Sequence, residues 1–133
     1  MPFYKLYYHI VWATKERYPF ITPEIEAFLF PTVAKKCREK HALVCAVNGM
    51  PDHVHLVISA SPKIALSDLV KHVKGTTSFG ISDRFKISFG WQRGYSVFSL
   101  GYDGLDPAVQ YVKMQKQHHR EDTCIEMYEA IQP

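Results

Sequence analysis

Residues 42–60 contain the pattern that most restricts how this chain can fold. Two runs rich in aliphatic and β-branched residues, ALVCAVNGM and HVHLVISA, are separated by the turn residues Asn48, Gly49 and Pro51. Each run has the length and composition of a β-strand. Because the connection is short and rich in turn residues, the simplest pairing is an antiparallel hairpin. We therefore expect a β-sheet that contains this hairpin.

Strand and helix patterns precede the hairpin. Residues 4–12 carry aromatic and β-branched side chains on both faces, which is typical of a central strand. A threonine-proline pair at residues 22–23 is a common helix start, and we expect this helix to run to about His41. Pro31 lies inside that segment, so the sequence predicts a kink or a break near Phe30.

Further elements follow the hairpin. An apolar stripe at helical spacing predicts a second helix, formed by Leu66, Leu69, Val70 and Val73. Residues 75–94 contain four glycines and show no clear pattern, whereas YSVFSL at residues 95–100 predicts a fourth strand. An aspartate-proline pair at residues 106–107 predicts a third helix that runs to about His119. A capping box at residues 123–126 predicts a short last helix.

The order of these elements is strand, helix, strand, strand, helix, strand and then helices. It predicts an α+β, ferredoxin-like βαββαβ antiparallel sheet with helices on one face and a tyrosine-bearing C-terminal helix. The 133 residues are 47% hydrophobic, enough to form one domain spanning residues 1–133. Three cysteines without a CxxC pair, and no apolar run of membrane-spanning length, favour a cytoplasmic protein.

Two histidines, His53 and His55, lie one residue apart in the second strand of the hairpin. Alternation puts both on one face and leaves on the other, wholly apolar face Val54, Leu56, Ile58 and Ala60. If helices cover the apolar face, the imidazoles point to the open face, roughly 6.5 to 7 Å apart along the strand. They could then bind one metal ion. A polar pair on a half-exposed sheet face explains the same spacing equally well.

The helix expected at residues 106–119 has an unusually polar face. Tyr111, Gln115 and His119 recur at i, i+4 and i+8, so this face is the candidate source of a third metal ligand. An amphipathic surface helix with a half-buried tyrosine explains the same pattern. His119 fits either a residue near the metal or the phosphate or a solvated residue at the helix end, and we favour the second and leave it out of the metal site. Asp52 fits either an acceptor that orients a histidine or a turn residue.

Five blocks occur in order along the chain, namely HIVWATKERY, MPDHVHLVIS, LVKHVKG, WQRGYSVFSL and YVKMQKQHHR. With these blocks the chain resembles the HUH single-tyrosine transposases of small bacterial and archaeal insertion sequences. The resemblance implies that His53 and His55 hold a divalent metal, Mg²⁺ or Mn²⁺. It implies that Gln115 completes the metal site and that Tyr111 is the nucleophile.

The resemblance also has implications for substrate and assembly. Such a transposase recognises hairpins at insertion-sequence ends, and cleaves and rejoins single-stranded DNA through a 5′-phosphotyrosine intermediate. Family members are homodimers, in which the tyrosine helix of one subunit commonly docks against the histidines of the other. With the resemblance as their basis, the candidate DNA contacts are Lys63, Lys71, Lys74 and Arg93.

Other functions compete with this one. A domesticated relative would keep the fold and act on genomic repeats. A non-catalytic module could instead bind nucleic acid on the open sheet face, as RNA-recognition domains do. Nucleases that rely on carboxylates are disfavoured, because the thirteen acidic residues show no paired arrangement beside an apolar strand.

Overall fold

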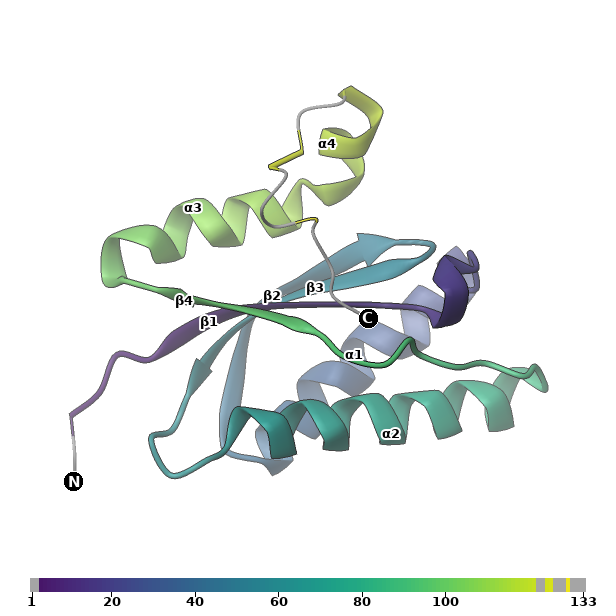
Figure 1. Ribbon diagram of the computed structural model, residues 1–133, viewed down its shortest axis with the longest axis horizontal. Coiled ribbons are helices and arrows are strands. Elements are labelled where there is room, and N and C mark those ends of the chain that lie inside the picture. Colours follow the sequence, from purple (N-terminus) through teal and green to yellow (C-terminus); the bar gives the residue numbers. More distant parts are fainter. Residues whose placement is uncertain (1–2, 122–123, 126–128, 130–133) are drawn as a thin grey trace.

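The computed structural model describes residues 3–121, 124, 125 and 129. A four-stranded antiparallel sheet with the order β2-β3-β1-β4 lies between two layers of helices (Figure 1). The predicted α+β, βαββαβ order is confirmed. No helix among these residues is long and apolar enough to cross a membrane. The elements are β1 (Tyr7–Ala13), the 3-10 turn η1 (Lys15–Arg17), α1 (Pro23–Glu39), β2 (Ala42–Met50), β3 (His53–Ala60), α2 (Leu66–Phe85), β4 (Ser96–Leu100), α3 (Tyr102–Lys113) and α4 (Gln115–Glu121).

β1 is the central strand that its apolar faces predict. It pairs with β3 on one side and with β4 on the other, and its neighbours Ile10 and Val11, which point to opposite faces, are both fully buried. The strand begins at Tyr7 and not at Tyr4, because Tyr7 is the first residue that pairs with β3 and β4.

β2 and β3 form the predicted hairpin around Pro51. Asn48 pairs with His55 in this hairpin, and Met50 pairs with His53. Gly49 is required beside the turn, because a Cβ atom there would lie 2.2 Å from the carbonyl oxygen of His53. The turn therefore fixes the register that puts both histidines on one face of the sheet.

α1 and α2 cover the other face, as the sequence predicts, and pack against Val54, Leu56, Ile58 and Ala60. α1 is not broken near Pro31, contrary to the expectation. Pro31 and Ala27, whose carbonyl loses its hydrogen-bond donor, are both exposed, so water can solvate that carbonyl. α2 extends to Phe85, well into the stretch without a clear pattern, because buried residues continue at helical spacing with Thr77 and Ile81.

α3 lies on the opposite face of the sheet from α1 and α2 (Figure 1). Its apolar side forms a second small core, in which Ala108 and Val112 pack with Ala46 and Val57. The prediction that this helix starts at residues 106–107 is wrong. It starts at Tyr102, and the proline is tolerated inside it because that side of the helix faces water.

The expected single helix to His119 is interrupted at Met114, where the backbone leaves the helical conformation (φ −97°, ψ 20°). The side-chain amide of Asn48 donates to the carbonyl of Lys113 at 3.1 Å and so caps α3. α4 then starts at Gln115. The capping box predicted at residues 123–126 lies outside the described residues.

Lys116 anchors α4 to the rest of the chain. Its ammonium group donates to Glu26 Oε2 at 2.8 Å, to Asn48 Oδ1 at 3.0 Å and to the carbonyl of Gly49 at 3.1 Å. These bonds tie α4 to α1 and to the end of β2, beside the histidine hairpin. The helix that carries Gln115 is thus held beside the chain's own histidines.

Candidate active site

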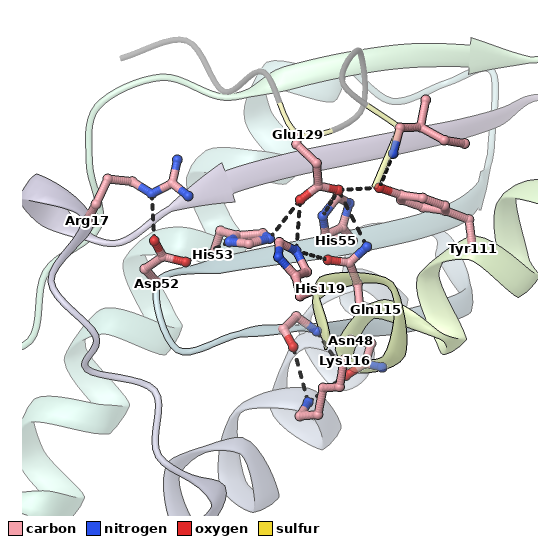
Figure 2. Close-up of polar contacts among 12 residues, drawn as sticks. Arg17, Asn48, Asp52, His53, His55, Tyr111, Gln115, Lys116, His119 and Glu129 are labelled. Atoms are coloured by element: carbon pink, nitrogen blue, oxygen red, sulfur yellow. Dashed lines mark hydrogen bonds and ion pairs between the residues drawn. The ribbon is translucent and has the colours of Figure 1, made fainter. Parts of the chain in front are cut away.

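His53 and His55 project from β3 into the space under α3 and α4 (Figure 2). Their exposed fractions are 2% and 0%, and their ring centroids lie 5.1 Å apart. The predicted placement of both histidines on one face is confirmed. This face is not open, however, since the two C-terminal helices cover it, so the pair is not half exposed.

Asp52 orients the ring of His53. The Nδ1 atom of His53 hydrogen-bonds Asp52 Oδ1 at 2.7 Å, and Arg17 Nε donates to Asp52 Oδ2 at 3.0 Å. Burial opposes the charge of Asp52, but these hydrogen bonds outweigh it and lower the pKa of Asp52 from 3.8 to about 2. Burial likewise opposes the charge of His53, yet the carboxylates of Asp52 and Glu129 raise its pKa. Of the two roles considered for Asp52, the structure supports the acceptor role.

Replacing Asp52 with asparagine should therefore destabilise the fold in a pH-dependent way. The pKa of Asp52 is lower when folded, so its stabilisation is fully present above about pH 4 and is lost as pH falls through about 2. At pH 7 we expect a loss of about 1 to 2 kcal/mol, discounted because the side chain is 29% exposed. Urea unfolding from pH 7 to pH 3 checks this prediction, and an equal loss at both pH values would contradict it.

His9 of β1 orients the ring of His55. Its Nε2 atom lies 2.9 Å from His55 Nδ1, and both side chains are fully buried. Burial and the neighbouring His55 lower the pKa of His9 to about 3, so His9 is neutral at physiological pH. When His55 Nδ1 donates this hydrogen bond, its Nε2 keeps a free lone pair for a metal. The sequence-based interpretation did not include His9, although it stands on the same sheet face as His55.

Tyr111 and Gln115 lie opposite the histidines, although a helix break separates them. Both are buried, and the ring centroid of Tyr111 lies 5.9 Å from that of His55. Burial and the nearby carboxylate of Glu129 raise the pKa of Tyr111 above its usual range. The structure thus brings together, in one chain, the four residues proposed from the sequence for the nucleophile and the metal site.

Glu129 is the site residue that the sequence-based interpretation missed. Tyr111 donates its hydroxyl proton to Glu129 Oε2 at 2.5 Å. The carboxylate oxygens also lie 3.1 Å from His53 Nε2 and 3.0 Å from His55 Nε2. Burial opposes the charge of Glu129, but the two imidazoles and the tyrosine hydroxyl outweigh it and hold its pKa well below the usual range.

His119 also belongs to the site, so its interpretation as a solvated helix-end residue is wrong. Its Nε2 atom lies 2.9 Å from Gln115 Oε1 and 3.1 Å from Glu129 Oε1. Its ring centroid lies 5.2 Å from that of His53. The neighbouring His118 instead stacks on Tyr111, with ring centroids 4.7 Å apart. The i+8 spacing from Tyr111 was the signal that pointed to His119.

The donors at this site fit a divalent metal. The Nε2 atoms of His53 and His55 are buried, yet within the described residues neither has a hydrogen-bond partner of good geometry. The Nδ1 atom of each ring is engaged, which is the usual arrangement for histidines that bind a metal through the other nitrogen. The chemistry of these residues therefore suits an ion bound at the two Nε2 atoms.

Two of the four candidate DNA contacts lie away from this site. Lys71 and Lys74 are on α2, in the helix layer on the other side of the sheet (Figure 1). The ammonium group of Lys74 donates to the carbonyls of Gln92 and Gly94 at 2.8 and 2.9 Å, so it holds a loop in place. In contrast, Lys71, Lys63 and Arg93 are exposed. Their role in DNA binding stays a prediction.

A βαββαβ sheet whose buried histidine pair faces a helix-borne tyrosine has the features of the tyrosine transposase class. The family model of IS200-like transposases matches residues 2–115. The ISDra2 transposase of Deinococcus radiodurans is 35% identical over 125 residues, which cover 89% of this chain and 88% of the relative. The chain therefore belongs to the IS200-like transposase family, whose activity is the transposition of insertion-sequence DNA.

Further relatives agree with this assignment. The IS200 transposase of Salmonella typhimurium is 28% identical over 120 residues, covering 85% of this chain and 78% of the relative. A crystal structure of a Deinococcus radiodurans protein assigned as a transposase aligns with a TM-score of 0.71 and 26% identity, over 91% of this chain and 92% of that one. The REP-associated tyrosine transposase bound to a REP hairpin shares the fold, with a TM-score of 0.69 at 13% identity over 90% and 73% of the chains.

Proposed function

We propose that this chain is a metal-dependent transposase that cleaves and rejoins single-stranded DNA through a 5′-phosphotyrosine intermediate. Tyr111 is the nucleophile, and His53, His55 and Gln115 hold Mg²⁺ or Mn²⁺. One observation carries the proposal: the buried Tyr111 and Gln115 face two imidazoles whose Nδ1 atoms are already engaged. Such oriented imidazoles are ready to bind a metal next to a nucleophile.

In this mechanism the phenolic oxygen of Tyr111 attacks the scissile phosphorus. The bond from phosphorus to the 3′ oxygen breaks, and the 5′ phosphate stays on the tyrosine. A divalent ion at the histidines would polarise a nonbridging phosphate oxygen. The phenolic proton, which Tyr111 donates to Glu129 in a hydrogen bond, leaves as the oxygen attacks, and the departing 3′ oxygen takes up a proton. The 3′-hydroxyl of another DNA end then attacks the phosphotyrosine and rejoins the DNA.

The substrate we propose is single-stranded DNA with hairpins at insertion-sequence ends. We also propose that the enzyme is cytoplasmic, that residues 1–133 form one domain, and that it acts as a homodimer. A cleft beside His53 is lined by Arg17, Asp52 and His119, and Arg17, which is paired with Asp52 at 3.0 Å, is the cation nearest to a phosphate bound there. The relative solved with a REP hairpin supports this class of substrate. The non-catalytic alternative is disfavoured, because α3 and α4 cover the sheet face that such a module would use.

The test is incubation with a hairpin-bearing single strand and Mn²⁺, followed by a denaturing gel. Two copies of the DNA carry a fluorophore at the 3′ end or at the 5′ end. A 5′-phosphotyrosine links the 3′ fragment, so only the 3′ label should migrate with the protein. The fully duplex form of the same sequence is the control. An adduct that carries the 5′ label, or no adduct with any hairpin-bearing single strand, would overturn the proposal.

A further inference from the structure

Glu129 stands where the two histidines and the tyrosine converge (Figure 2). Its Oε1 atom is 3.1 Å from His53 Nε2, and its Oε2 atom is 3.0 Å from His55 Nε2. Each carboxylate oxygen therefore faces a different imidazole. The hydroxyl of Tyr111 donates to Oε2 at 2.5 Å, and the Glu129 side chain is mostly buried, with 18% exposed.

These contacts are close, but they are not directed as hydrogen bonds. Among the described residues, the buried Nε2 atoms of His53 and His55 have no partner of acceptable hydrogen-bond geometry. Their Nδ1 atoms are engaged by Asp52 and His9. Two imidazoles therefore direct their Nε2 atoms toward one carboxylate. A cation bound between these nitrogen and oxygen atoms would suit this arrangement better than protons on the imidazoles would.

The chemistry of the donor set points in the same direction. Two imidazoles and the amide of Gln115 are all neutral ligands. Mg²⁺ and Mn²⁺ are hard cations that favour oxygen ligands, especially carboxylates. Glu129 is the carboxylate that the site lacks if only those three residues are counted. The ligand atoms of His53, His55 and Glu129 all lie within 4.8 Å of one another.

We propose that Glu129 is a carboxylate ligand of the same divalent ion as His53 and His55, so that this one residue from beyond α4 completes the metal site. The inference rests on the proposed function for the ion itself. It adds an anionic ligand from a position 18 residues beyond Tyr111. The hydrogen bond from Tyr111 then places the nucleophile directly on a ligand oxygen.

The test compares Mn²⁺ binding by wild type and Glu129→Gln, measured by calorimetry and by the spin-resonance signal of free Mn²⁺. The change keeps the shape of the side chain and removes its charge. We expect Mn²⁺ affinity to fall at least about 10-fold, with partial recovery in Glu129→Asp. Glu121→Gln, an exposed change on α4, is the matched control and should bind as wild type does. Thermal unfolding without metal checks that each variant is folded.

Two results would overturn the inference. Unchanged affinity in Glu129→Gln would show that the carboxylate is not a ligand. Increased affinity would show that Glu129 competes with the ion for the histidines. The DNA reaction of wild type shows whether the inference about Glu129 or the proposed function is wrong. If wild type forms the adduct and the variant binds Mn²⁺ normally, only this inference fails. If affinity falls but wild type forms no adduct, only the proposed function fails.

Discussion

Replacing Tyr111 with phenylalanine should abolish the covalent protein-DNA adduct, with a loss of at least about 1,000-fold. The change removes one oxygen atom, which is the proposed attacking atom. The fold should survive, because the ring keeps its packing and the lost hydrogen bonds, to Glu129 and from the Ile125 amide, cost about 1 to 3 kcal/mol. The measurement is the yield of 3′-labelled DNA that migrates with the protein on a denaturing gel.

The matched control is Tyr102→Phe. Tyr102 begins the same helix, α3, but its side chain is exposed and stands apart from the histidines. This variant should form the adduct at the wild-type rate. An adduct that persists in Tyr111→Phe, or one that disappears equally in both variants, would contradict the assignment of Tyr111 as the nucleophile.

The second large effect is expected for His55→Leu. Leucine fills a similar volume and removes both ring nitrogens, so the strand keeps its packing while the metal site loses a ligand. Loss of a residue that only hydrogen-bonds a metal ligand lowers metal affinity roughly 10- to 100-fold. Loss of the ligand His55 itself should lower Mn²⁺ affinity by more than this, and adduct formation should fall as well. Calorimetry with Mn²⁺ and the adduct assay measure the two effects separately.

His72→Leu is the control for this variant. His72 lies on α2, is partly exposed and contacts Glu39, in the helix layer on the other side of the sheet. It should bind Mn²⁺ and form the adduct as wild type does. Because His55→Leu removes the contact between His9 Nε2 and His55 Nδ1, some loss of stability is expected, and circular dichroism must show a folded protein. Normal Mn²⁺ binding by folded His55→Leu would refute the metal site.

Local patterns were sufficient to predict most of the fold. The bounds of β2 and β3 follow from two apolar runs and their turn, and alternation puts His53 and His55 on the correct face. The errors occur where local rules depend on solvent exposure. Pro31 does not end α1, and the proline in α3 does not start it, because each lies on an exposed side of its helix.

The site was only partly predictable for a different reason. Helical spacing grouped Tyr111 with Gln115 and strand spacing paired the histidines, but only the resemblance to the transposase family gave these residues their roles. His9 and Glu129 have no such local signal, since both are far from His55 in the sequence and meet it only in the folded chain. A single histidine in a strand and one glutamate among several nearby acidic residues look ordinary in the sequence.

We expect Tyr111 to become covalently bound to DNA beside the histidine pair. The most direct test is peptide mapping by mass spectrometry after wild type has reacted with a hairpin-bearing single strand and Mn²⁺. We expect a 5′-phosphonucleotide on the peptide that contains Tyr111, and no such modification when EDTA replaces Mn²⁺. A nucleotide on any other residue, or modification of Tyr111 that is equally strong in EDTA, would contradict it.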